Sequence, residues 1–495
     1  MKRLFATLTT ISLVFSGAVA ANAANAADAY SAEATTVPKG GAVFLVAEEG
    51  NFMPVSTLAG HESNSHDSNA WACNGALDPK CAIGKANDIS GNALLPVCDS
   101  DRAENCIVSF EIAGPGKDFE KASYVRKATG QTFPAVLSVG YIGGSTASLW
   151  EAPGTPSASG TTSYAVIANV QTSRRPNGKW ETGDFMATVV PYRAQTGDYR
   201  DPEQMTANTD DVKGTRTSVF GIGYNDQRCA WNEKGTCGVV QDFVEGTRVR
   251  LTVRMSSSIG GWFKGRLKNP LISVSKYSAK NNQVTVEAEP ATVTRMSYTV
   301  QDNKILSAEE EKFVKQNGFG GGRTPGFVTW APAWQGLSFS YVDYFRNKVK
   351  DTASGVNSYW NFGSNTNQGG TNRCLDDKSK VLGIVTTNSM IYAGGVPKFE
   401  NGFLNYKVAG LHYMPNGTDL AVGVYDMVMR SDVARCLYGF SKAPLSATVS
   451  VVSDQGEKST ATTVVSEKNG WLKLAAYGFT FSNKTIKVKI TKKKK

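Results

Sequence analysis

Alternating apolar and polar residues mark the middle of the chain. At 248–255 the odd positions are Val, Leu, Val and Met, and the even positions are three arginines and a threonine. Successive side chains of a strand point to opposite faces, so this pattern predicts a half-buried strand with a basic outer face. Two more alternating runs, 271–275 and 283–288, flank the polar segment 278–282. The middle of the chain therefore predicts an antiparallel β-meander.

Similar runs of apolar or alternating residues occur on both sides of the meander. The clearest are 42–47, 107–112, 163–170, 185–190, 381–392, 404–429, 447–452 and 486–490. One helix is predicted at 308–316, where Ser307 and Glu310 form a capping box and Gly318 follows. With 49 glycines and frequent Ser, Thr, Asn and Val, the composition favours strands and turns. We predict a mainly β protein of antiparallel β-sandwich-like domains, with one short helix and a small C-terminal β module.

Turn-rich stretches and shifts in composition suggest how the 495 residues are divided. The predicted divisions are a signal peptide at 1–26, an N-terminal β domain with two short disulfide loops at 27–153, a central β domain at 154–302, an aromatic-rich β domain at 303–442, and a C-terminal β module with a Lys-rich tail at 443–495.

The first residues have the pattern of a secretory signal. Lys2 and Arg3 precede an apolar run at 4–20, and small residues suited to cleavage follow at 18–26. We expect cleavage between Ala23 and Ala27; the alternative is an uncleaved anchor. No later segment approaches the ~18 apolar residues that a membrane span needs. The mature protein is therefore expected to be secreted or held at the cell surface, with no transmembrane segment.

Eight cysteines agree with export, because an even number in an exported chain is typical of disulfides. Three pairs share the same short spacing, which carries the prediction of local bridges. A metal site is disfavoured, because the chain has no CxxC motif. The predicted bonds are Cys73–Cys81, Cys98–Cys106, Cys229–Cys237 and Cys374–Cys436.

Two segments support export by resemblance. The segment 462–474 reads TTVVSEKNGWLKL, and the segment 261–267 reads GWFKGRL. Both resemble segments of uncharacterised secreted β-rich proteins of high-GC Gram-positive bacteria. The resemblance lies mainly in 443–495. It implies export, and it implies no activity.

Two polar clusters are candidates for metal binding. Asp99, Asp101 and Glu104 lie within one short cysteine loop and offer oxygens suited to calcium; the alternative is a hydrated acidic turn. The other cluster is His61 and Glu62 with His66 and Asp67. Its two histidines are five residues apart, which places them on different faces of a helix, so they do not match the zinc protease motif. A solvated loop is favoured, and a metal site carried by the loop is the alternative. Apart from calcium, no cofactor is expected.

Catalytic motifs are scarce. The chain has no Gly-x-Ser-x-Gly elbow and no phosphate loop, and only three histidines, of which His412 lies in a strand-like, structural context. Glycoside hydrolysis by two carboxylates needs no histidine, and four carboxylates lie near aromatic residues: Glu181, Asp184, Asp343 and Asp426. We therefore favour a structural or glycan-binding protein over an enzyme, with a secreted carboxylate-pair hydrolase as the alternative.

Two sets of residues are candidates for ligand binding. Trp330, Trp334 and Trp360 lie in the aromatic-dense stretch 327–362 and can stack on sugars, unless they belong to the core. The net charge is +10, with basic residues gathered on one strand and in the C-terminal tail. These are Arg248, Arg250, Arg254, Lys484, Lys487, Lys489 and Lys492–Lys495. Since export removes intracellular nucleic acid as a partner, the expected partner is an anionic envelope polymer or polysaccharide. The alternatives are a solvated basic face and, for the whole protein, a subunit of a surface array.

Overall fold

The computed structural model covers the chain in several stretches. It describes residues 42–47, 55–61, 70–79, 88–197, 229–233, 235–300, 307–309, 312, 327–332, 338–364, 372–377, 379–440, 445–453, 458–459, 461–481 and 484–492. The predicted signal peptide lies outside the described residues.

The predicted mainly β fold is confirmed. Most strands belong to one 21-stranded network of paired strands, and the others form a six-stranded sheet. The N-terminal strands of the network are β1 (Ala42–Ala47), β2 (Thr57–His61), β3 (Ala70–Ala72), β4 (Asp88–Leu94), β5 (Cys106–Ala113), β6 (Glu120–Lys121), β7 (Ser123–Lys127), β8 (Ser148–Glu151), β9 (Ser163–Arg174), β10 (Trp180–Thr196), β11 (Cys229–Glu233) and β12 (Thr236–Val240). A 3₁₀ turn at Leu137–Val139 precedes β8.

The remaining strands of the network run through the centre and the C-terminal part of the chain. They are β13 (Arg248–Ser256), β14 (Gly261–Lys276), β15 (Asn281–Val300), β16 (Phe327–Pro332), β17 (Gly355–Ser364), β18 (Val381–Thr387), β22 (Val422–Arg430), β25 (Thr462–Lys468) and β26 (Trp471–Thr480). The predicted meander is present, because β15 pairs antiparallel with both β13 and β14. The apolar residues of β13 are fully buried, as the alternation predicts.

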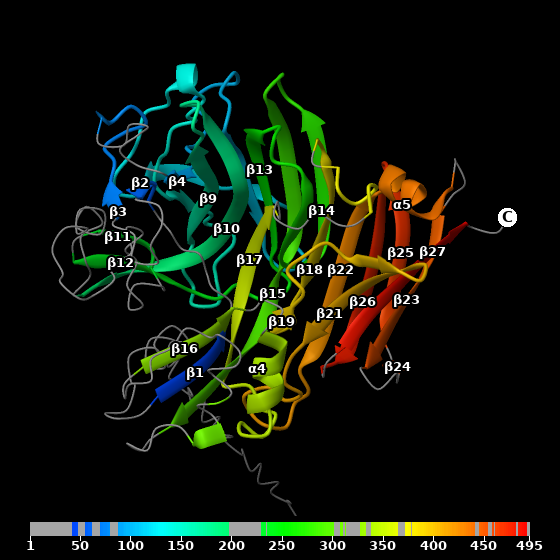
Figure 1. Cartoon of the computed structure of the whole chain (residues 1–495). Coiled ribbons are helices and arrows are strands. Elements are labelled where there is room, and N and C mark those ends of the chain that lie inside the picture. The colour runs from blue at the N-terminus through cyan, green and yellow to red at the C-terminus, as the bar shows by residue number, and fades with distance from the viewer. Residues whose placement is uncertain are drawn as a thin grey trace, which may run out of the picture.

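The six-stranded sheet contains β19 (Ile391–Tyr392), β20 (Lys398–Glu400), β21 (Phe403–Ala409), β23 (Leu445–Ser453), β24 (Lys458–Ser459) and β27 (Lys484–Lys492). One hydrophobic cluster joins it to the network: Met427 of β22 and Leu474 of β26 pack with Tyr406 of β21 and Val488 of β27. The C-terminal part is therefore a β-sandwich, visible at the right of Figure 1.

Two helices are described in full. Helix α4 (Ser338–Phe345) buries Phe339, Val342 and Phe345 in a small core. Helix α5 (Ser431–Tyr438) ends at Gly439, which adopts the left-handed conformation. The sequence predicts a single helix elsewhere, at 308–316; its described residues 308, 309 and 312 are helical. Both α4 and α5 were missed, because their residues lie among aromatic and strand-like segments.

Strand pairs cross each predicted domain boundary. β5 pairs with β13, β10 pairs with β17, and β22 pairs with β26. The segment 443–495 supplies strands to both layers of the sandwich. The division into domains stays a prediction, but hydrogen-bonded sheets join its parts.

Three disulfides of the predicted scheme are confirmed: Cys98–Cys106, Cys229–Cys237 and Cys374–Cys436. Cys73 is also disulfide-bonded, and its predicted partner Cys81 lies outside the described residues. The last of the three bonds ties the loop at 372–377 to α5 across a separation of 62 residues. In the chain-entropy model, closing such a long loop stabilises the fold by about 4 kcal/mol.

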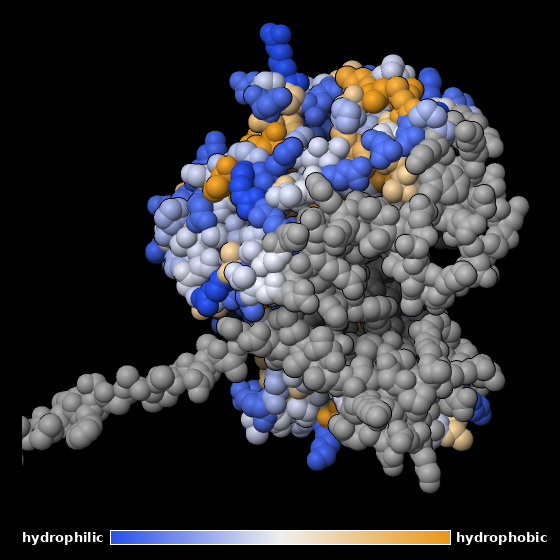
Figure 2. All heavy atoms as spheres, turned by 90° about the vertical axis from the view of Figure 1, so that its left-hand side faces the viewer, coloured by the Kyte–Doolittle hydropathy of each residue, from blue (hydrophilic) through white to orange (hydrophobic). Residues whose placement is uncertain are grey.

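The surface turned to the viewer in Figure 2 is mainly hydrophilic where it is coloured, and its hydrophobic side chains gather in small groups. Among the described residues, no helix is long and apolar enough to cross a membrane.

Candidate functional site

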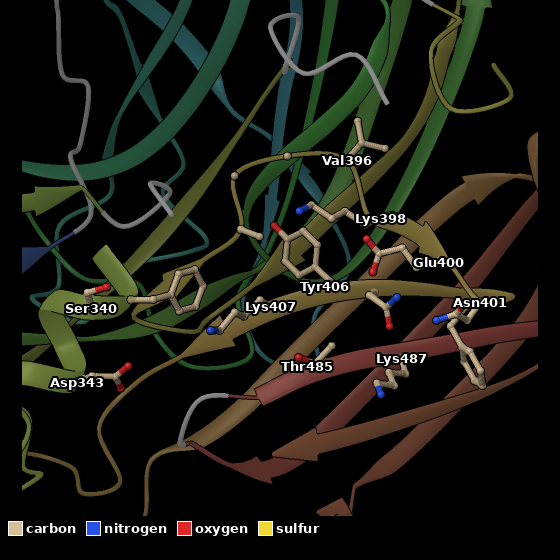
Figure 3. Close-up of a pocket in the computed structure, with 16 residues that line it drawn as sticks. Ser340, Asp343, Val396, Lys398, Glu400, Asn401, Tyr406, Lys407, Thr485 and Lys487 are labelled. Carbon is tan, nitrogen blue, oxygen red and sulfur yellow. The ribbon is translucent and has the colours of Figure 1, made fainter. Parts of the chain in front are cut away.

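A cavity of about 910 Å³ lies against the six-stranded sheet. Helix α4, the loop at 393–396 and strands β20, β21 and β27 form its walls (Figure 3). Its charged residues are Lys398, Lys407, Lys487, Asp343 and Glu400. Three lysines and two carboxylates therefore line one open groove.

Strand alternation turns these lysines toward the groove. In β21, Leu404 and Val408 are buried in the sandwich, whereas Asn405 and Lys407 are only half-buried. In β27, Ile486 and Val488 are buried in the same way, and Lys487 lies between them. Because successive side chains of a strand point to opposite faces, the polar residues share the outer face of the sheet.

The strand register aligns polar side chains in a row across four strands. Lys398 of β20 lies opposite Asn405 of β21. Asn405 in turn lies opposite Lys487 of β27, and Lys487 lies opposite Ser450 of β23. Neighbouring strands are about 4.8 Å apart, so the row presents one ammonium, amide or hydroxyl group at each such step.

Aromatic rings accompany the lysines. The Lys407 Nζ lies 4.9 Å from the centre of the Phe339 ring, and the Lys489 Nζ lies 5.6 Å from that of Phe403. Both rings belong to residues that line the groove. Each contact places a lysine ammonium group over the face of a ring that lines the groove.

The two carboxylates of the groove lie apart. Asp343 projects from α4 and Glu400 from β20, and Figure 3 places them at opposite ends of the cavity. Lys407 lies nearer to Asp343, and Lys398 lies nearer to Glu400. In Figure 3, Thr485 lies between the two carboxylates, and Lys487 lies on the side of Glu400.

The three predicted tryptophans do not form a described binding surface. Trp360 of β17 is fully buried, and its indole N–H donates to the Ala288 carbonyl oxygen at 3.1 Å. This corrects its expected role, because a ring inside the core cannot meet a glycan. Trp330 has its backbone in β16, and its side chain is outside the description, as is all of Trp334.

The predicted basic face of β13 is neutralised. Arg250 bonds Glu111 of β5 at 2.7 Å and Glu287 of β15 at 2.8 Å. Arg248 also pairs with Glu287. Arg254 is buried and donates to the Ala103 carbonyl oxygen at 2.9 Å. The expected role of these arginines in polymer binding is therefore corrected: they join neighbouring strands and a loop.

The predicted calcium ligands are not gathered into a site. The backbone oxygen of Asp101 accepts a hydrogen bond from the Tyr277 hydroxyl, and Glu104 accepts one from Ser278. Across the described parts of the chain, no group of three or more His, Cys, Asp or Glu side chains could hold a metal ion, so Asp99, Asp101 and Glu104 do not form one. Of the four residues in the cluster around His61, the structure describes only His61, which ends β2. Glu62, His66 and Asp67 lie outside the described residues.

The four carboxylates predicted for hydrolysis lie in different places. Glu181 pairs with Arg175 on an exposed hairpin, and Asp184 lies in the same strand, β10. Asp426 of β22 is buried. Only Asp343 lines the groove, where Glu400 is the other carboxylate.

His412 has a structural environment, as expected. Its Nδ1 lies 2.5 Å from the Asp351 carboxylate, and its backbone N–H donates to the same carboxylate at 3.0 Å. Burial raises the pKa of Asp351, but the hydrogen bonds from His412 and the charge of Arg346 outweigh burial and hold this pKa below its ordinary value. The cluster ties the segment after α4 to the loop after β21.

Sequence reasoning found one lysine of the groove, Lys487, through its position in the basic C-terminal segment. It missed Lys398, Asn405 and Lys407. The i, i+2 spacing of Asn405 and Lys407 was a usable signal for a shared face, but the pairing of β21 with β27 was not visible in the sequence. Lys493–Lys495 of the predicted tail lie outside the described residues.

Comparison of the chain with protein-family models, curated proteins and solved structures finds no significant match.

Proposed function

We propose that this is a secreted or cell-surface protein that binds an anionic polysaccharide in the groove along the six-stranded sheet. The observation that carries the proposal is the row Lys398, Asn405 and Lys487, which crosses three strands at the groove and continues to Ser450 of β23. The three disulfides are compatible with an oxidising, extracellular environment.

The chemistry of the row suits an acidic sugar chain. An extended polymer lying across the strands meets a new side chain about every 4.8 Å. Lysine ammonium groups pair with carboxylates or sulfates on the sugars, while Asn405 and Ser450 hydrogen-bond hydroxyl groups. The ring of Phe403, which is only partly buried, offers apolar surface to the C–H faces of the same chain.

The distribution of charge favours an anionic ligand over a neutral one. The three lysines of the groove outnumber its two carboxylates, which lie at the ends. The lining therefore carries a net positive charge, which an acidic polymer would neutralise and a neutral sugar would not. Exposed pairs of this kind are screened over about 8–10 Å at physiological salt, so binding is expected to weaken as salt rises.

A carboxylate-pair hydrolase is the second candidate, favoured by the presence of Asp343 and Glu400 in the same groove. Hydrolysis requires two carboxyl groups about 5–10 Å apart on either side of the bond that is cut. Binding needs no such spacing, and it uses the lysines, for which hydrolysis offers no role. We therefore place binding first.

Affinity electrophoresis of the disulfide-bonded mature protein tests the proposal. Gels containing polygalacturonate, a sulfated dextran or unsubstituted dextran are compared. We expect retardation by the acidic polymers, little by unsubstituted dextran, and loss of retardation as salt is added. Equal migration in all gels at low salt would contradict the proposal. Shortening of a polymer during incubation, abolished by Asp343→Asn or Glu400→Gln, would favour the hydrolase instead.

A further inference from the structure

A second polar cluster lies away from the groove, where the central sheet meets the sandwich. Lys473 of β26 donates from its Nζ to the side-chain oxygen of Asn269 in β14, and the two are in direct contact. The same Nζ lies 3.6 Å from Asp426 Oδ1 of β22. An amine, a carboxamide and a carboxyl group therefore meet, although Asn269 and Lys473 are 204 residues apart.

Asp426 is the buried member of this cluster. Its side chain is 0 % exposed, and it accepts hydrogen bonds from the Tyr477 hydroxyl at 2.6 Å and from the Asn269 backbone N–H at 2.9 Å. Burial raises the pKa of Asp426 above its ordinary value, although the charge of Lys473 opposes the shift. A carboxyl group in this environment holds a proton more readily than an exposed one.

Lys473 is also withdrawn from water, with 13 % of its side chain exposed. An amine attacks a carbonyl carbon only when it is neutral. Transfer of one proton between Lys473 and Asp426 leaves a neutral amine beside a neutral acid. The contact with Asn269 then holds the amine beside the carboxamide. Because the two groups are held together by the fold, their reaction is effectively unimolecular.

The backbone directs Asn269 to this place. Asn269 has a positive φ of 56°, and the register of β14 against β15 shifts between Lys268 and Leu271. A bulge of this kind re-aims a side chain that regular alternation would send elsewhere. Asn269 is exposed at the surface, so a small leaving group has a path to solvent.

We propose that Lys473 and Asn269 become joined by an intramolecular isopeptide bond, with Asp426 as the proton shuttle. The neutral Lys473 Nζ attacks Asn269 Cγ while protonated Asp426 hydrogen-bonds the carbonyl oxygen. Asp426 then takes a proton from Nζ and delivers one to Nδ2. The new C–N bond forms, the old C–N bond breaks, and ammonia leaves. Nothing is oxidised or reduced, and no other reactant is consumed.

This bond would join the central meander covalently to the sandwich. β14 belongs to the central meander, and β26 belongs to the sandwich whose other layer carries the groove. A force that pulls the sandwich away from the meander would then be resisted by a covalent bond as well as by the hydrogen bonds and packing between β14 and β22.

Peptide mapping of the reduced, alkylated full-length mature protein tests the bond. Trypsin should release residues 269–276 joined to 469–484, with no cleavage at Lys473 and a combined mass lower by one ammonia. Succinimide formation at Asn469–Gly470 also loses ammonia, but it leaves Lys473 cleavable and the peptides separate. Recovery of 269–276 and 469–473 as separate linear peptides from folded protein would overturn the proposal.

Conservative variants separate the chemistry from the fold. Lys473→Arg keeps the charge but should lose the cross-link, and Asp426→Asn should leave the amine and the amide unjoined. Lys268→Arg, a neighbouring lysine paired with Glu289 at 2.9 Å, is the matched control and should keep it. Circular dichroism verifies that each variant is folded. A cross-link that persists in folded Asp426→Asn would overturn the role of Asp426.

Discussion

Asn405 of β21 lies directly opposite Lys487 of β27, and this one pair joins two parts of the chain that the sequence suggests are separate domains. The pair lies in the groove, with Lys398 on the far side of Asn405. Because side chains alternate between the two faces of a sheet, Lys407 of β21 and Thr485 of β27 share the outer face with this pair. The proposed binding surface is thus a consequence of register.

Arg250 should contribute to the stability of the fold and not to polymer binding. Arg250→Ala removes bonds to Glu111 and Glu287, which are only partly exposed, and should lower the free energy of unfolding by about 1–2 kcal/mol. Urea unfolding measures this loss. Arg175→Ala, which breaks an exposed pair with Glu181, is the control and should change stability by less than about 0.5 kcal/mol. Neither variant should alter polymer binding; a binding loss specific to Arg250→Ala would restore the basic face as a site.

Trp360 should affect stability rather than recognition. Trp360→Ala removes a fully buried ring and its bond to Ala288, with an expected loss of about 3–5 kcal/mol. Trp360→Phe keeps most of the volume and should lose less. Thermal unfolding measures both. Folded Trp360→Ala with wild-type stability but weakened binding would contradict the assignment of this ring to the core.

Asp351 should contribute to stability above its ordinary pKa. Its folded-state pKa lies below the unfolded value of 3.8, so the stabilisation is present above that value. It is lost as pH falls from the unfolded value through the folded-state pKa, because over that range the unfolded chain binds more protons than the folded one. In thermal unfolding between about pH 2 and pH 6, Asp351→Asn should flatten the acid fall of Tm. His412→Gln, which removes the partner, should act in the same direction. An unchanged acid slope in both variants would show that the pair contributes no such stabilisation.

The local patterns of the sequence predict much of the fold. The alternation at 248–255 places Val249 and Leu251 in the core, and the shared spacing of eight residues predicts Cys98–Cys106 and Cys229–Cys237. Each of these depends on residues close in sequence. Helix α4 was missed because its aromatic residues suit strands as well as helices, and burial of Phe339 and Phe345 decides between them.

The site could not be predicted in the same way. Arg250 looks free in the sequence, and the glutamates that neutralise it come from two other strands. The groove depends on the register of β20, β21 and β27, which no local pattern specifies. Lys473 and Asn269 meet only because β26 pairs with β22 beside a bulge in β14.

The central claim concerns the lysines of the groove, and calorimetric titration of polygalacturonate into the mature protein and its variants tests it most directly. Lys398→Glu with Lys487→Glu should weaken binding about tenfold or more, since each exposed ion pair contributes up to ~1 kcal/mol and reversal adds repulsion. Lys468→Glu, an exposed lysine of β25 outside the groove, should leave the affinity nearly unchanged. Equal weakening by Lys468→Glu, or unchanged affinity of the double variant, would contradict binding in the groove.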